Sequence, residues 1–196
     1  MSPDIIFGEV TREKIKIDAR ELSARLGGYC TSCSSVADEY IYEILDAASP
    51  RYAARLVDVE YTDDGAVSIA GRKIYSAALI KNLAGAEQAY LLAVTLGIEV
   101  DRYLKRMSAI SPARHFIADG VASALAEALA DASEREICKG YTSRPRFSPG
   151  YADIPLSYQS ALLAALSDER RLGISLTDSY LMIPTKSISA IIGIEK

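Results

Sequence analysis

The short sequence RPRFSPGY, which ends at Tyr151, combines residue types that can hold a small charged molecule. Arg146 lies between two prolines, whose rings fix backbone φ angles, and its planar guanidinium suits bidentate binding of a carboxylate. Gly150 follows Pro149 and permits backbone conformations that are closed to other residues. Two interpretations are open at this point: a ligand-binding loop, or a rigid connection between helices in which Arg146 pairs with a neighbouring acid.

Cysteines and histidine offer a second kind of chemistry. Cys30 and Cys33 form a C-x-x-C pair, but a zinc site would need two further ligands, from Cys138, His115 or a second subunit. A thioredoxin-like redox role would place such a pair at a helix N-terminus after a strand, whereas this pair follows a Gly-Gly helix stop. We expect ordinary loop cysteines, with redox or metal chemistry as the alternative. His115 is the only histidine, and its position early in a long helical pattern favours a solvated or capping role.

Acid/base and nucleotide-binding motifs are absent from the sequence, which has no G-x-G-x-x-G, Walker A, H-E-x-x-H or G-x-S-x-G pattern. Glu127, Asp131 and Glu134 are spaced at i, i+4 and i+7, which places them on one face of a helix. We expect that face to be solvated rather than to form an acid/base set.

Composition narrows the class of protein. The chain has 196 residues, 49% of them hydrophobic, which is enough to bury a substantial core. The net charge of -4 gives no basic field for nucleic acid or an anionic membrane surface, and no partner of either kind is expected. The apolar runs are shorter than the roughly 20 residues of a membrane span, and the N-terminus does not resemble a signal peptide. We therefore expect a cytoplasmic protein with reduced cysteines.

The first half of the chain predicts alternating short elements. We expect Asp18 to cap a helix that stops at Gly27-Gly28, with a short strand before it. Asp64-Gly65 has the composition of a hairpin turn. The expected elements are a strand at 14–18, a helix at about 34–48, a hairpin at 55–71, a helix at 76–84, a buried strand at 89–97 and a helix at 98–107.

The second half begins with an alanine-rich pattern from Pro112 to Cys138, which predicts one long helix whose small residues let another element approach closely. After the RPRFSPGY loop we expect a helix at 156–173 capped by Ser157. Two closing runs, 174–184 and 186–194, alternate well enough to predict a hairpin between them. Without a regular βαβ rhythm, the chain predicts an α+β fold with a largely antiparallel sheet and flanking helices.

Several segments in the second half resemble the activation domain of cobalamin-dependent methionine synthase. That family has an R-x-x-P-G-Y-x-x-x-P loop, matched by RFSPGYADIP, and G-x-x-L-T-E-S-x-x-M-x-P and S-V-S-G strands, similar to GISLTDSYLMIP and SISA. The alanine-rich helix is also similar. The resemblance is specific over 112–193 and weaker over 76–111. We expect a single unit at 1–196, in which 76–196 is family-like and 1–75 shows no visible match.

The resemblance implies a curved α+β scaffold with a shallow groove for S-adenosylmethionine. Arg146 would bind the carboxylate of the ligand, and Ile192 replaces a family tyrosine beside the adenosine. An acidic contact near the start of the domain would be Asp4 or Asp18. The binding residues implied in this way are Arg146, Pro149, Gly150, Tyr151, Ile192 and Gly193.

The resemblance also implies a function and partners. The protein would present S-adenosylmethionine to the cobalamin of a separate methionine synthase that lacks its own activation domain, so that inactive cob(II)alamin is reductively methylated. A flavodoxin- or ferredoxin-type protein would donate the electron. No catalytic residue and no metal ligand is expected in the chain itself. An alternative is a non-catalytic module that binds a corrinoid protein or another nucleotide-like ligand, and a third hypothesis gives the C-x-x-C pair a redox role.

Overall fold

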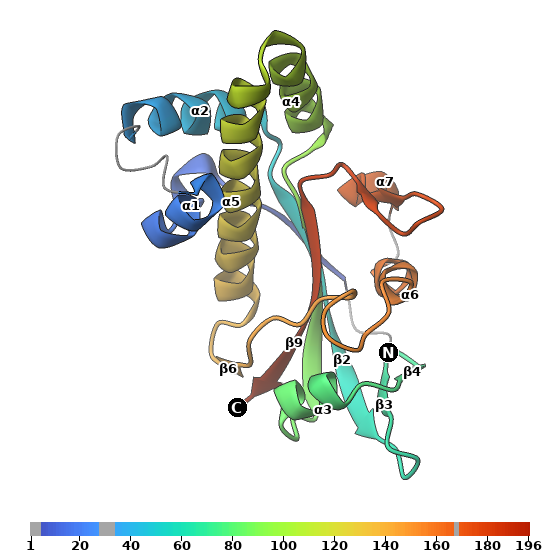
Figure 1. Cartoon of the computed structure of the whole chain (residues 1–196). Coiled ribbons are helices and arrows are strands. Elements are labelled where there is room, and N and C mark those ends of the chain that lie inside the picture. The colour runs from blue at the N-terminus through green and yellow to red at the C-terminus, as the bar shows by residue number, and fades with distance from the viewer. Residues whose placement is uncertain (1–4, 28–33, 167–168) are drawn as a thin grey trace.

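A computed structural model describes residues 5–27, 34–166 and 169–196 (Figure 1). A mixed set of helices and antiparallel strands follows in chain order. These elements are β1 (Ile6–Glu9), a 3-10 turn (Arg12–Lys14), α1 (Ala19–Leu26), α2 (Ser34–Ala47), β2 (Arg51–Tyr61), β3 (Val67–Ile69), β4 (Arg72–Ile74), α3 (Ala77–Leu83), β5 (Gln88–Thr95), α4 (Ile98–Ile110), α5 (Pro112–Ile137), β6 (Thr142–Ser143), α6 (Tyr158–Ala165), α7 (Glu169–Leu172), β7 (Ser175–Leu176), β8 (Met182–Ile183) and β9 (Ser187–Glu195).

An antiparallel sheet organises the chain. In the described part of the chain its strands follow the order β4-β3-β2-β5-β9-β6, and β1 pairs with the other end of β2. Strand β5 pairs along its whole length with β2 on one side and β9 on the other, and it is almost entirely buried. The predicted α+β fold with a largely antiparallel sheet is confirmed, as is the buried strand in the middle of the chain.

Helices cover the two faces of this sheet and create two hydrophobic cores. One core joins α1, α2, α4 and α5 to one face, and the other joins α3, α6 and α7 to the opposite face. Figure 1 shows the long α5 beside the sheet on one side and α6 with α7 on the other. Strand β9 therefore has α5 on one face and α6 on the other, and the edge of this strand that does not pair with β5 lies between the two helical layers.

Helix α5 is long because its sequence favours helical backbone, and its small residues suit close packing. Pro112 begins the helix at a position where its missing N–H costs nothing, and the many alanines favour helical backbone. Gly120 allows α1 to approach, since a Cβ atom there would lie 2.8 Å from Cδ2 of Leu26. The predicted helix from Pro112 is confirmed and ends at Ile137.

Two predictions near the N-terminus have different outcomes. The strand predicted at 14–18 is wrong, because a 3-10 turn ends at Lys14 and the following residues have extended but unpaired backbone. Ile15 and Ile17 alternate because they pack on the helical core, not because they belong to a sheet. The predicted cap is confirmed, since Oδ1 of Asp18 accepts hydrogen bonds from the backbone N–H groups of Arg20 and Glu21. Gly28 lies outside the described residues.

The C-terminal third differs most from the sequence prediction. The two closing runs do not pair with each other: β7 pairs with β8 in a small separate hairpin, and β9 enters the main sheet beside β5. Strand β9 is buried over most of its length, which a two-stranded hairpin could not provide. The helix predicted at 156–173 is interrupted, because α6 ends at Ala165 and α7 begins at Glu169. Ser157 does not cap α6 with its side chain.

Asp153 links the loop before α6 to the first turn of α3. Its carboxylate accepts a hydrogen bond from the hydroxyl of Ser76, the N-cap residue of α3, and another from the backbone N–H of Ala78 at 3.4 Å. The Ser76 bond holds the pKa of Asp153 below its ordinary value of 3.8. This carboxylate therefore fixes the loop against the helix.

We expect Asp153→Asn to lower the melting temperature at neutral pH, because the variant loses a charged acceptor at a helix N-terminus. A lowered pKa in the folded state stabilises the protein above the pKa of the unfolded chain, and this contribution disappears as pH falls through the folded-state value. Differential scanning calorimetry of both proteins should therefore show melting temperatures that converge as the pH falls below the folded-state pKa of Asp153. A difference that stays unchanged as the pH is lowered through the acid range would contradict the assignment.

Candidate functional site

A groove of about 790 Å³ opens between α5, the loop that precedes α6, and the edge of β9. Its walls mix charged, aromatic and small polar side chains. The lining residues are Glu127, Glu134, Pro145, Arg146, Phe147, Ser148, Pro149, Tyr151, Ala152, Gln159, Met182, Ser187, Ile188 and Ser189. Six of the eight residues of RPRFSPGY thus line one wall of the groove.

Backbone hydrogen bonds and fixed dihedral angles shape this wall. Phe147 pairs with Ile191 of β9 through two backbone hydrogen bonds of 2.9 and 2.8 Å, which attach the loop to the sheet. Gly150 has φ +87°, a conformation that favours glycine, and its N–H donates to the carbonyl of Ile154 at 3.0 Å. A Cβ atom at Gly150 would lie 3.1 Å from Cδ1 of Leu156. The backbone conformation therefore favours glycine here, whereas a side chain would require only a shift of a few tenths of an ångström at the end of Leu156.

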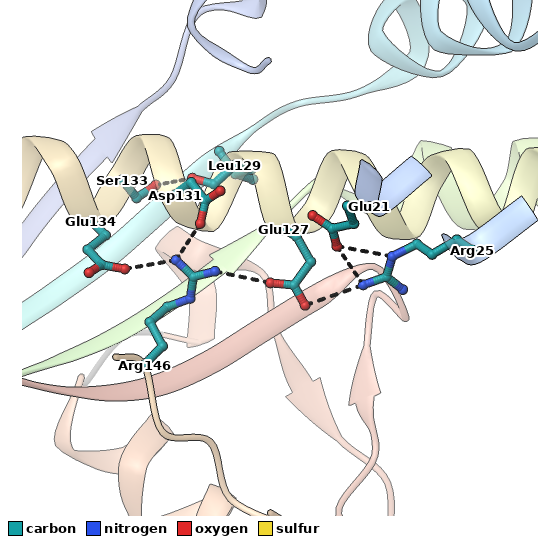
Figure 2. A network of polar contacts seen from close by, with 8 residues as sticks. All are labelled: Glu21, Arg25, Glu127, Leu129, Asp131, Ser133, Glu134 and Arg146. Carbon is teal, nitrogen blue, oxygen red and sulfur yellow. Dashed lines mark hydrogen bonds and ion pairs between the residues drawn. The ribbon is translucent and has the colours of Figure 1, made fainter. Parts of the chain in front are cut away.

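Arg146 lies at the centre of an ionic network with helix α5 (Figure 2). Its Nη1 donates to Asp131 at 2.6 Å and to Glu134 at 2.8 Å, and its Nη2 donates to Glu127 at 3.1 Å. Arg25 of α1 contacts the other oxygen of Glu127 at 3.6 Å. The Arg146 side chain is only 19% exposed, so these contacts are largely screened from solvent.

This network keeps the guanidinium of Arg146 charged and leaves an excess of negative charge beside the groove. Burial alone would lower the pKa of Arg146, but the hydrogen bonds and charges of Asp131 and Glu134 outweigh burial and raise the pKa above its ordinary value. Arg146 faces three carboxylates and Arg25 contacts only one of them, so this cluster beside the groove carries more negative than positive charge. Such a site suits a ligand that carries a negative group for Arg146 and positive groups for the neighbouring carboxylates.

Of the residues that were predicted to bind a ligand, some line the groove and others do not. Arg146, Pro149 and Tyr151 line the groove, and the Tyr151 side chain is 69% exposed. Gly150 shapes the loop but does not line the groove. Ile192 is fully buried in the core on the α5 side, and the carbonyl of Gly193 accepts a hydrogen bond from Arg144 N–H at 2.7 Å. A role for these last two residues stays a prediction, and the part of β9 that lines the groove is Ser187–Ser189.

The prediction that Glu127, Asp131 and Glu134 form a solvated face holds only in part: Asp131 is 45% exposed, but all three carboxylates contact the guanidinium of Arg146. The sequence signal was present, since their spacing places them on one helix face, but it did not reveal what that face meets. Sequence analysis also missed Gln159, Ser187 and Ser189 in the groove. Isolated serines and glutamines carry no pattern that separates a groove from a surface.

The other candidate residues either make structural contacts or lie outside the described residues. Cys30, Cys33 and Asp4 lie outside the described residues, and Asp18 is used as the cap of α1. Nδ1 of His115 lies 3.2 Å from the carbonyl of Leu104, which links α5 to α4. Among the described residues, no group of three or more histidine, cysteine or acidic side chains could hold a metal ion. The described helices also include none with the length and apolar character to cross a membrane.

Cys138 lies at the end of α5 and is 7% exposed. Burial, together with the nearby charge of Glu134, raises the pKa of its thiol to about 11, so almost no thiolate forms at neutral pH. We expect Cys138 in the folded protein to resist iodoacetamide at about pH 8 and to react once urea unfolds the chain. Mass spectrometry of the Cys138 peptide measures this directly, and rapid labelling in the folded state would contradict it.

The fold and groove together define a class: an α+β protein with a groove at the edge of an antiparallel sheet, between a long alanine-rich helix and a proline- and glycine-containing loop. Residues 77–196 match the family described as vitamin B12 dependent methionine synthase, activation domain. The chain belongs to this family.

A solved structure shares the fold across nearly the whole chain. It is the crystal structure of the MetH reactivation domain bound to AdoHcy, at 18% sequence identity and a TM-score of 0.69, covering 98% of this chain and 78% of that chain. The fold likeness therefore includes the N-terminal part that shows no family pattern in its sequence. A search of curated proteins finds no match.

Proposed function

We propose that the groove binds S-adenosylmethionine and that Arg146 holds the carboxylate of its methionyl end. The observation that carries this proposal is the placement of Arg146, which is held at the groove by the loop and by helix α5. The three hydrogen bonds to carboxylates use three of its N–H groups. A guanidinium has five such groups, so Nε–H and one Nη2–H can still bind a carboxylate edge-on.

The acidic side chains around Arg146 suit the cationic groups of the same ligand. S-adenosylmethionine carries an ammonium and a sulfonium cation beside its carboxylate, so it brings one net positive charge. Glu127 and Glu134 line the groove next to Arg146 and would offset that charge. A purely anionic ligand would instead meet net repulsion here.

The rest of the groove suits the nucleoside end of the ligand. Phe147 and Tyr151 offer aromatic rings, and Gln159, Ser187 and Ser189 offer neutral hydrogen-bonding groups. Ile188 packs on the α5 core, whereas Ser189 hydrogen-bonds Gln159 of α6, so the groove spans the edge of β9 from one sheet face to the other. An extended ligand could cross this edge with its charged end at α5 and its neutral end at α6.

In this proposal the chain supplies binding and orientation, not acid/base chemistry. A cobalamin bound by a separate methionine synthase would accept the methyl group after a one-electron reduction, and S-adenosylhomocysteine would leave. A flavodoxin- or ferredoxin-type protein would provide the electron. The role of this chain is to hold the methyl donor in a fixed position, which alone can supply a large part of a rate enhancement.

A reactivation assay tests this function. A methionine synthase that lacks its own activation domain is converted to the cob(II)alamin form and mixed with S-adenosylmethionine, a reduced flavodoxin and this protein. We expect loss of the cob(II)alamin absorbance and formation of methylcobalamin only when this protein is present. Equal rates with and without it would contradict the proposed repair activity.

The alternative function is a binding module that recognises a corrinoid protein without supporting methylation. Ile192 favours it, because this residue replaces the family tyrosine and is fully buried. Binding of the corrinoid protein without binding of S-adenosylmethionine and without acceleration of methylcobalamin formation would support this alternative over the first function.

A further inference from the structure

Gln159, in the first turn of α6, joins three segments at the end of the groove away from Arg146. It is 4% exposed and lines the groove. Its Nε2 donates to the carbonyl of Tyr180 at 2.8 Å, and its Oε1 accepts from the hydroxyl of Ser189 at 3.1 Å. One amide group thus connects α6, strand β9 and the loop between β7 and β8.

The amide of Gln159 also keeps hydrogen-bonding capacity. A primary amide has two N–H donors and two acceptor positions, and the contacts to Tyr180 and Ser189 use one of each. One donor and one acceptor therefore remain on a side chain that lines the groove. This combination matches the neutral donor and acceptor groups of a purine or a ribose, rather than a charged group.

The segment that Gln159 holds carries exposed apolar side chains. Tyr180 has φ +63°, and the turn is closed by Thr177, whose carbonyl accepts from the N–H of Tyr180 and whose hydroxyl accepts from the N–H of Leu181. Leu181 is 57% exposed, and Met182, directly after it, lines the groove. The hydrogen bond from Gln159 to the Tyr180 carbonyl is one of the contacts that tie this tip to the groove.

We infer that Gln159 is a positioning and specificity-determining residue that hydrogen-bonds the neutral, nucleoside end of the ligand while it fixes the 177–182 tip at the rim of the groove. This inference rests on the proposed function, because it takes S-adenosylmethionine as the ligand. Occupancy of the groove and the position of the tip are then coupled through a single amide.

The absence of tryptophan from the sequence allows a clean test. Leu181→Trp places one fluorescent reporter on the tip, at a residue that does not line the groove. In this background Gln159→Met keeps the length of the side chain but loses the amide, and Gln159→Glu keeps the acceptor for Ser189 but loses the donor to Tyr180. Ser160→Ala, at the next and exposed position of α6, is the matched control.

We expect S-adenosylmethionine to shift the tryptophan emission of the Leu181→Trp protein and of the Ser160→Ala control. Both Gln159 variants should lose this shift and bind the ligand at least about fivefold more weakly, which matches loss of one or more hydrogen bonds. A merely structural role would lower the melting temperature without removing the shift at temperatures where the protein is folded. If Gln159→Met fails to fold, Gln159→Glu decides the result.

Unchanged affinity in the Gln159 variants would overturn the inference and leave the proposed function intact. Weaker binding with an unchanged emission shift would also overturn it, because the tip would then be independent of Gln159. Failure of both the wild-type protein and the reporter protein to bind S-adenosylmethionine would instead overturn the proposed function, and the inference with it.

Discussion

Replacing Arg146 with alanine is expected to weaken binding of S-adenosylmethionine at least about tenfold, since a charge-assisted hydrogen bond is worth about 1.5–3 kcal/mol. The same substitution is expected to destabilise the fold, because Glu127, Asp131 and Glu134 would lose the cation that they share. Isothermal titration calorimetry measures the first effect, and denaturant unfolding measures the second.

The size of the stability effect follows from burial. Removing one partner of a fully buried ion pair costs about 3–5 kcal/mol. Arg146 is 19% exposed, but Asp131 is 45% exposed, so solvent screens part of the repulsion among the remaining carboxylates. We therefore expect the free energy of unfolding to fall by about 2 kcal/mol, below the range for a fully buried pair.

Arg25→Ala is the matched control for this experiment. Arg25 also contacts Glu127, but it is 34% exposed and lies on α1, outside the residues that line the groove. Its loss should change the free energy of unfolding by less than about 1 kcal/mol and leave ligand affinity nearly unchanged. Equal effects of the two arginine substitutions would show that only general surface charge matters.

Leu129→Ala is expected to have the largest effect on stability alone. Leu129 is fully buried in the core between α5 and the sheet, and deletion of a buried leucine side chain leaves a cavity that costs about 2–5 kcal/mol. Because Leu129 does not line the groove, the variant should bind S-adenosylmethionine normally at temperatures where it remains folded. Chemical denaturation and calorimetric titration of the same sample separate the two properties.

The control for Leu129→Ala is the same substitution at Leu181, which is 57% exposed on the 177–182 tip. Surface substitutions of this kind change stability by only about 0.5 kcal/mol. A comparable loss of stability at both positions would mean that α5 is not the packed centre of the fold.

Elements with strong local signals could be predicted from the sequence. The alanine-rich run of α5, the Asp64-Gly65 turn between β2 and β3, and the apolar run of β5 each carry their own pattern of propensity and burial. The loop around Arg146 could also be singled out, because prolines and glycine restrict its backbone. These features depend on neighbouring residues in the chain, and the structure has them where the sequence placed them.

Features that depend on distant partners could not be predicted. The alternating pattern of β9 suits pairing with the run before it as well as pairing with β5, and only the depth of burial in the folded chain favours β5. The alternation of Ile15 and Ile17 likewise reflects helices that pack on them from elsewhere in the chain. Local periodicity reports burial, but it does not identify what covers the buried side.

The candidate site shows the same limit. Sequence reasoning left open a pairing of Arg146 with a neighbouring acid, and the structure confirms such a pairing. It did not identify the acids, because nothing local connects α5 to a loop that begins several residues after it. The 12 to 19 residues between each acid and Arg146 are bridged only by the fold. Gln159 and Ser189 are joined across 30 residues in the same way.

Calorimetric titration of S-adenosylmethionine into the wild-type protein tests the central claim most directly. We predict saturable binding with one ligand per chain, weakened when Arg146 is replaced by alanine. The titration is repeated in the presence of a cobalamin-bound methionine synthase that lacks an activation domain, so that a groove completed by the partner is also detected. Absence of binding under both conditions would contradict the assignment of this groove as a site for S-adenosylmethionine.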